Sequence, residues 1–468
     1  MSRLAVFVPL LLVACAEPTA GPDAGADAST DTAWSAPALI GPEASLEDTN
    51  PDPDVVEVSL RAEMVEVDLG DGTTRPMLGY NGMVPGPVLQ AKVGDEVIVH
   101  FENHTWDATT VHWHGLRISD EMDGSPRIQE PVAAEGGTFT YRFVVPEAGT
   151  FWYHPHVRTN EQLELGLVGT LIVHDREDPV FDAERMIVLD DVLIDPATDQ
   201  IAPFLRFHPE LVHGRSGNVL LTDGQVSPGP ERTARPGQIE RWRIVNTANA
   251  RTMSLSLSGA TMRVIATDGG RIAEPFETGR LELPVGQRYE LEVRYGAAGT
   301  VALQSHVLVV NDAGDVVEQA IPVYVVDVDG EAVEPRELVW PELATPEPRT
   351  VDREVEMSFD AIDDPAEGIL WRINGEAHRM EPLFTFGQGE TVRITLANLA
   401  GQEHPFHLHG QFFEVPGRPG LYDTVLVGGS ETVEIIAHLD NPGRWMAHCH
   451  ILEHAELGMM SEIVVDPR

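Results

Sequence analysis

The chain has 468 residues, with 31 Lys and Arg against 75 Asp and Glu, and its formal net charge at pH 7 is −44. This charge argues against nucleic acid and anionic lipid surfaces as partners, because both are polyanions. The length corresponds to about three domains of usual size. The 42 Gly and 35 Pro favour short strands and turns over a helical fold.

The first 15 residues are predicted to be a signal peptide. Arg3 precedes an apolar run over residues 4–13 that is too short for a stable transmembrane helix. The run ends in Leu-Val-Ala-Cys, which resembles a bacterial lipoprotein cleavage box in which Cys15 is lipidated. The alternative is an ordinary secretory signal that is cleaved nearby. Both alternatives predict export to the periplasm or cell surface, and the lipoprotein alternative adds a lipid anchor at Cys15 as the only contact with the membrane.

Residues 16–53 consist mainly of Ala, Asp, Pro, Thr and Gly. Such a segment buries too little apolar surface to offset the entropy of ordering it, so we expect a disordered acidic tether. The chain has two cysteines, Cys15 and Cys449. If Cys15 is lipidated or removed, Cys449 is a free thiol in an oxidising compartment, and metal ligation would explain its presence there.

From Val55 onward, apolar residues alternate with polar ones, which predicts β-strands. A longer repeat is superimposed on this pattern, because three Gly-to-Asn intervals have the same length: Gly94 to Asn103, Gly237 to Asn246, and Gly389 to Asn398. The same interval then leads to His112 in the first copy, to Leu255 in the middle copy and to His407 in the last copy. Three Greek-key barrel or sandwich domains are therefore predicted, over residues 54–176, 180–333 and 349–468.

Histidines cluster at matching positions of the first and last copies. The middle copy has Leu255, Leu257, Gln304 and Ser305 at these positions, so we expect a spacer without metal. Single His-x-His pairs are often polar surface, but these clusters recur in order. They comprise His112 and His114; His154 and His156; His404, His407 and His409; and His448, Cys449, His450, His454 and Met459.

The segment 448–459 contains most of a blue-copper ligand set. Such a site takes two His, one Cys and a weak axial Met. Cys449, His454 and Met459 can supply three of these ligands, and the second His must come from elsewhere. On a strand, His448 and His450 point to the face opposite Cys449, so they suit a different metal centre.

The four clusters, in this order over residues ~55–468, resemble those of three-domain multicopper oxidases of the laccase type. The resemblance implies an all-β fold of three consecutive cupredoxin-like domains that bind four copper ions. It implies that the type 1 copper is bound by His404, Cys449 and His454, with Met459 axial, and the type 2 copper by His112 and His407. The ligands of the two type 3 coppers would be His114, His154, His156, His409, His448 and His450.

The family's chemistry implies partners and catalytic roles. A small phenolic or aromatic donor would give single electrons to the type 1 copper, and Cys449, His448 and His450 would pass them on until O2 is reduced to two waters. Asp123 matches an acidic position beside the cluster that serves proton supply, although Asp123-Gly124 also suits a turn. Relatives often have Glu after the last type 1 histidine, where this chain has Ala455 followed by Glu456.

Other functions remain open at this point. A metallo-oxidase for Fe(II) or Cu(I) is one alternative: the acidic surface is compatible with Fe(II), whereas the 13 scattered Met form no Met-rich insertion of the kind typical of Cu(I) oxidases. A non-catalytic cupredoxin binding protein is a further alternative, against which the intact ligand set counts. Three repeats exclude a two-domain nitrite reductase. A monomer is expected.

Overall fold

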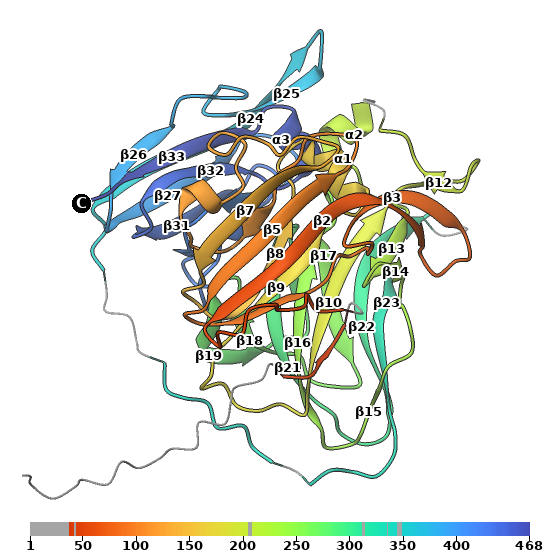
Figure 1. Ribbon diagram of the computed structural model, residues 1–468. Coiled ribbons are helices and arrows are strands. Elements are labelled where there is room, and N and C mark those ends of the chain that lie inside the picture. Colours follow the sequence, from red (N-terminus) through yellow and green to blue (C-terminus); the bar gives the residue numbers. More distant parts are fainter. Residues whose placement is uncertain (1–36, 42–43, 205–207, 311–313, 335, 344–348) are drawn as a thin grey trace, which may run out of the picture. The chain divides into compact units, whose positions relative to one another are not determined.

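The computed structural model describes residues 37–41, 44–204, 208–310, 314–334, 336–343 and 349–468, which belong to one compact unit (Figure 1). The predicted signal peptide over residues 1–15 lies outside them. None of the helices in the described ranges has the length and apolar character needed to cross a membrane.

The all-β prediction is confirmed, because each of the three domains consists mainly of two sheets. The first domain has sheets of strand order β3-β2-β5-β7 and β4-β9-β8-β6. Its elements are β2 (Val55–Asp68), β3 (Thr74–Tyr80), β4 (Leu89–Lys92), β5 (Glu96–His104), β6 (His112–His114), η1 (Asp120–Met122), β7 (Gly137–Val144), β8 (Gly149–His154), α1 (Thr159–Glu164) and β9 (Gly169–His174).

The second domain has a large sheet, β14-β13-β10-β16-β21-β18-β19, and a smaller one, β15-β23-β22-β17-β20. Its elements are β10 (Ala183–Val192), β11 (Ile194–Asp195), β12 (Gln200–Ile201), α2 (His208–His213), β13 (Val219–Thr222), β14 (Gln225–Val226), β15 (Thr233–Ala234), β16 (Ile239–Asn246), β17 (Met253–Ser258), β18 (Arg263–Thr267), β19 (Gly270–Glu277), β20 (Leu281–Leu283), β21 (Arg288–Arg294), β22 (Gly299–Val310) and β23 (Val316–Val328).

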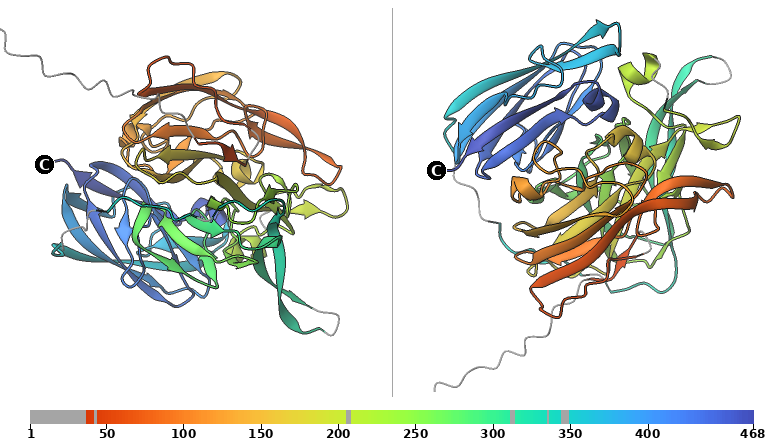
Figure 2. Two further views of the ribbon diagram at one scale, coloured as in Figure 1. Left: turned by 90° about the horizontal axis from the view of Figure 1, so that it is seen from below. Right: turned by 45° about the horizontal axis from the view of Figure 1, so that its top comes forward.

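The third domain has sheets of order β25-β24-β27-β31-β29 and β26-β33-β32-β28-β30. Its elements are β24 (Arg353–Asp364), β25 (Gly368–Ile373), β26 (Phe384–Gly387), β27 (Glu390–Asn398), β28 (His404–Leu408), β29 (Phe413–Glu414), β30 (Thr424–Val427), β31 (Thr432–Leu439), β32 (Gly443–Cys449), α3 (Leu452–Glu456) and β33 (Met460–Asp466). The further views show it (blue) beside the first domain (red to gold) (Figure 2).

The three sequence copies share the same local structure. At Asn81-Gly82, Asp223-Gly224 and Asn374-Gly375 both residues have positive φ, between 51° and 78°. Such pairs form the two-residue turns whose twist matches that of hairpin strands, and Asn, Asp and Gly tolerate this conformation. The asparagine that follows in each copy is buried, and its side-chain amide donates to a backbone carbonyl of the next loop: Asn103, Asn246 and Asn398.

The middle copy departs from the other two by one residue of strand register. His112 lies opposite His154 in the first domain, and His407 opposite His448 in the third. The equivalent Leu255 lies opposite Ser305, whereas the repeat places Gln304 there. Leu255 is fully buried in the core that the second and third domains share. The middle domain therefore uses this position for packing.

The predicted tether does not extend to residue 53. Leu39 and Ile40 form β1 (Leu39–Ile40), which pairs in parallel with β10. Leu46 donates its backbone N–H to Val88 O (2.9 Å) and packs against the core of the first domain. These few apolar side chains suffice to anchor the segment, so the prediction is wrong for its last part. Residues 16–36 lie outside the described ranges.

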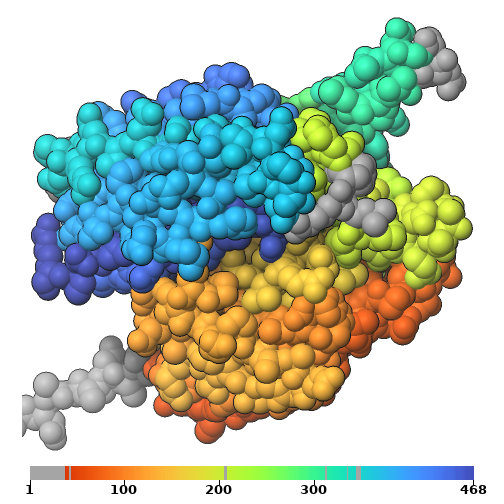
Figure 3. Space-filling model, turned by 90° about the horizontal axis from the view of Figure 1, so that it is seen from above, coloured from red at the N-terminus to blue at the C-terminus, as the bar shows by residue number. Residues whose placement is uncertain are grey.

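The space-filling view shows the third domain (blue) against the first (orange) (Figure 3). The hairpin of β22 and β23 projects at the upper right of this view and exposes Leu308 and Val310. The helices α1, α2 and α3, one from each domain, lie together, and α3 contacts both α1 and α2 (Figure 1).

Candidate metal centre

Three donor atoms of the third domain converge in a first cluster. His404 begins β28, Cys449 ends β32, and His454 lies in α3. Cys449 Sγ lies 3.5 Å from His404 Nδ1 and 3.7 Å from His454 Nδ1, and the two Nδ1 atoms lie 3.2 Å apart. Donors at about 2.0–2.3 Å from one first-row metal ion are separated by similar distances. The second histidine that the 448–459 segment lacks therefore comes from β28.

Met459 is held beside this cluster by the backbone. Its N–H donates to His454 O (3.0 Å), and its carbonyl accepts from Cys449 N (3.1 Å). Its side chain is fully buried in the core. Trp371 packs on His454, with ring centroids 4.1 Å apart, and its indole N–H donates to Leu211 O (2.9 Å). The cluster is thus enclosed by packed apolar side chains.

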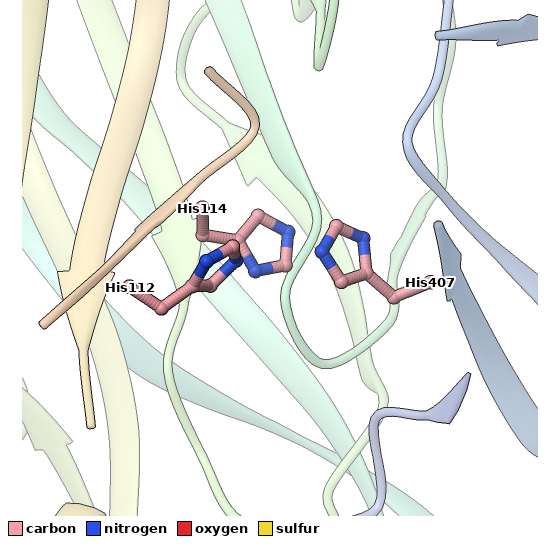
Figure 4. Close-up of side chains that lie close together, drawn as sticks. All are labelled: His112, His114 and His407. Atoms are coloured by element: carbon pink, nitrogen blue, oxygen red, sulfur yellow. The ribbon is translucent and has the colours of Figure 1, made fainter. Parts of the chain in front are cut away.

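A second cluster contains eight histidines, four from the first domain and four from the third. Pairs from the two domains stack face to face: His112 on His409 at 3.9 Å, and His114 on His407 at 3.8 Å between ring centroids. Figure 4 shows His112 and His114 on one strand, facing His407 across the boundary. The remaining members are His154, His156, His448 and His450; only His156 is partly exposed.

The orientation of the rings is set by hydrogen bonds on the side away from the cluster. His112, His154, His407 and His448 direct Nδ1 at backbone carbonyl oxygens 2.8–3.0 Å away. When Nδ1 carries the proton and donates it, Nε2 keeps a lone pair that can bind a metal. Proteins commonly orient histidine ligands through such a hydrogen bond. His114 is reversed, because its Nε2 faces Asp423 Oδ1 at 3.2 Å and its Nδ1 is free for the cluster.

The histidines of the second cluster fit a metal centre, because most of their inward-facing nitrogens are buried and have no hydrogen-bond partner in the part of the chain that the structure describes. Among the described residues nothing hydrogen-bonds to Nε2 of His112, His154, His156 and His407, or to Nδ1 of His114, although all these atoms are buried. Buried polar atoms are normally paired, since leaving them unpaired costs free energy. The nitrogens nevertheless converge: donor atoms of His114, His154 and His450 lie within 4.8 Å of one another, as do those of His112, His114 and His407.

Burial also favours the neutral form of imidazoles in both clusters. It lowers the pKa of His404 and of His448 to about 3, and it lowers the pKa of His454 well below its usual range. Neutral imidazole is the form that binds metals. Burial raises the pKa of the Cys449 thiol, so the thiolate requires a bound cation to compensate its charge.

Asp123 lies behind the second cluster, between two of its rings. Its Oδ2 accepts from His409 Nδ1 at 2.8 Å, its backbone O accepts from His112 Nδ1 at 2.8 Å, and its side chain is 1% exposed. Gly124 follows with φ +82°, so the residue also forms a turn, as the Asp-Gly pair predicts. The contact with His409 shows that turn formation is not its whole role.

Sequence reasoning missed the acidic residue on the opposite side of the cluster, Asp423. It precedes β30 and contacts His114, and its backbone O accepts from His407 Nδ1 (2.9 Å). Burial alone would raise the pKa of Asp423, but the Arg288 guanidinium outweighs this effect and holds the pKa well below its usual range. The only local signal is an Asp-Thr pair before a buried apolar strand, which is too common to identify a site.

A pocket of about 330 Å³ opens beside His454. Its lining includes His213, Thr252, Glu403 and Ile451. His454 Nε2 donates to Val212 O (3.1 Å) at the end of α2. The edge of this imidazole is therefore the part of the first cluster nearest to a space that a small molecule can enter.

Comparisons with known proteins agree with this arrangement. Three family models described as multicopper oxidase match residues 61–178, 209–311 and 348–468. The chain is 30% identical to multicopper oxidase MmcO of Mycobacterium tuberculosis, over 87% of this chain and 86% of that protein. It is 26% identical to Laccase-2 of Cryptococcus neoformans, over 85% and 82%. The structure of a Campylobacter jejuni multicopper oxidase, titled a metallo-oxidase, superposes with a TM-score of 0.78 at 26% identity, over 93% and 96%.

Three cupredoxin domains whose first and last members bring histidines together define an oxidase that uses copper and O2 with small-molecule donors. The chain belongs to the multicopper oxidase family, as a three-domain, laccase-like member.

Proposed function

We propose that the first cluster is a type 1 copper site that takes single electrons from phenolic or aromatic donors. A copper ion there would be held by His404, Cys449 and His454, with the Met459 thioether as a further, weak donor. The second cluster is a trinuclear site at which O2 is reduced to two waters. His112 and His407 would hold the type 2 copper, His114, His154 and His450 would hold one type 3 copper, and His156, His409 and His448 would hold the other.

The observation that carries this proposal is the direct connection between the clusters. Cys449 belongs to the first cluster, and its two neighbours in the chain, His448 and His450, belong to the second. Copper bound at these clusters would supply one-electron exchange with the donor and the four-electron reduction of O2. The protein holds the rings: carbonyl oxygens fix the tautomers, and burial keeps bulk water from the cysteine sulfur.

The donor would bind in the pocket beside His454, whose imidazole edge links pocket and cluster. One observation favours a second candidate function, oxidation of Fe(II) or Cu(I). In the part of the chain that the structure describes, no Phe, Tyr or Trp lines this pocket, whereas the Glu403 carboxylate and the His213 imidazole do. A carboxylate with an imidazole suits a cationic donor better than it suits an aromatic ring.

Oxygen uptake with a panel of donors tests the proposal and separates the two candidates. We expect a substituted phenol to be oxidised with at least a tenfold higher kcat/KM than Fe(II) or Cu(I), with four donor molecules consumed per O2. The reverse order of kcat/KM would identify a metallo-oxidase. Absence of oxygen uptake with every donor would contradict the proposed function.

The N-terminal sequence supports a proposed location. The protein is exported and held at the periplasmic or cell-surface side through lipid on Cys15, and it acts there as a monomer. The support is the apolar run before Cys15 and the buried, metal-binding position of the remaining thiol, Cys449.

A further inference from the structure

Arg288, at the start of β21 in the middle domain, is fully buried beside the histidine cluster. Its guanidinium donates two hydrogen bonds to the carboxylate of Asp423, from Nη1 to Oδ1 at 2.8 Å and from Nη2 to Oδ2 at 2.7 Å. Its Nε donates to Thr150 O (2.9 Å). One side chain of the middle domain thus bonds to both flanking domains.

Asp423 transmits this contact to two metal-binding rings. Its Oδ1 faces His114 Nε2 at 3.2 Å, and its backbone O accepts from His407 Nδ1 at 2.9 Å. Thr424 Oγ1 donates to Asp423 Oδ1 (2.9 Å) and lies 3.2 Å from His407 Nδ1. The Asp423 carboxylate therefore contacts a ring from the first domain directly. It reaches a ring from the third domain through Thr424 Oγ1, and its Oδ1 lies 3.6 Å from His407 Nδ1.

The middle domain supports this pair from a second side. Asp268 Oδ1 accepts from Arg288 N (2.7 Å), and Asp268 Oδ2 lies 3.3 Å from the backbone N of Asp423 and of Thr424. Gly286, with φ +87°, packs against the cluster: a Cβ there would lie 2.9 Å from His450 Cδ2 and 3.1 Å from His114 Cε1. The loop before β21 therefore forms a wall of the histidine cluster.

We propose that Arg288 is a positioning residue for the trinuclear centre, acting through Asp423 on His114 and His407. The middle domain then contributes to the metal site although it supplies no ligand. The guanidinium compensates the negative charge of a buried carboxylate, and its planar fork fixes the angle of that carboxylate in a way that an ammonium group cannot. This inference rests on the proposed assignment of the second cluster as the trinuclear site.

The test compares Arg288→Lys with Arg185→Lys in the copper-loaded, full-length protein. Arg185 is a matched control, because it too is a buried middle-domain arginine with two bonds to one carboxylate, Glu240 (2.5 and 2.7 Å). For Arg288→Lys we expect an altered electron paramagnetic resonance (EPR) spectrum of the type 2 copper and roughly 10–100-fold weaker copper binding at the trinuclear site. The blue absorption should be unchanged. Arg185→Lys should lower thermal stability without either effect.

If Arg288→Lys loses thermal stability but keeps the wild-type EPR spectrum and copper affinity, Arg288 only joins domains and the inference is wrong. If Arg288→Lys does not fold, Asp423→Asn must show the same spectral change, since it weakens the pair from the other side. An unchanged spectrum in Asp423→Asn overturns the inference. A wild-type protein that binds copper only at the Cys449 cluster would instead contradict the proposed function itself.

Discussion

Cys449→Ser is expected to abolish both the blue absorption of the copper-loaded protein and its oxidase turnover, while the fold is retained. A serine hydroxyl offers no soft thiolate, so the ligand set that distinguishes a blue copper site is lost. The eight histidines of the second cluster are unchanged, and we expect that cluster to keep its copper. Visible absorption measures the blue band, oxygen uptake measures the turnover, and circular dichroism measures whether the fold is retained.

Ser461→Ala is a suitable control for Cys449→Ser. Ser461 is also fully buried, and it lies on β33 opposite Ala447 of β32, outside both ligand sets. We expect this variant to stay blue and active. If Cys449→Ser also retained its colour and turnover, the assignment of the type 1 site would be wrong.

Asp123→Asn is expected to lower turnover by roughly 10²–10⁴-fold, the usual effect of losing one positioned acid–base group. The amide oxygen of Asn can still accept the His409 Nδ1–H, which Asp123 holds at 2.8 Å, but it cannot exchange a proton. Stopped-flow spectroscopy separates the half-reactions. Anaerobic bleaching of the blue band by the donor should be normal, and reoxidation by O2 should be slow.

Glu121→Gln gives the matched control for Asp123→Asn, because it removes a carboxylate from an exposed position of the same turn. It should leave both half-reactions at the wild-type rate. Slow bleaching with normal reoxidation in Asp123→Asn would show that Asp123 does not serve proton supply. A loss of copper from the second cluster would show that its contact with His409 is mainly structural.

Much of the fold and most of the candidate ligands follow from local sequence signals. The turn at Asn81-Gly82 and its two counterparts need residues that adopt positive φ, so the repeat is visible in the sequence. Histidines two apart on one strand point to the same face, and an antiparallel partner brings a second pair opposite them. His112 and His154 illustrate this, since they face each other on β6 and β8.

The features that the sequence could not predict depend on contacts between distant segments. Arg288 and Asp423 are 135 residues apart and meet only because three domains pack around the histidines. Glu456, the candidate substitute for the usual glutamate, accepts from Thr159 N at 3.0 Å. Its carboxylate thus engages the first turn of α1, which no local pattern indicates. Asp123 and Arg288 are therefore better candidates than Glu456 for tuning the cluster.

Copper content and visible absorption of the copper-loaded protein test the central claim most directly. We expect four copper ions per chain, an intense blue band that depends on Cys449, and no copper bound by residues 180–333, where Leu255 offers no donor atom. A colourless protein, or a reproducible excess of copper that maps to the middle domain, would contradict the account.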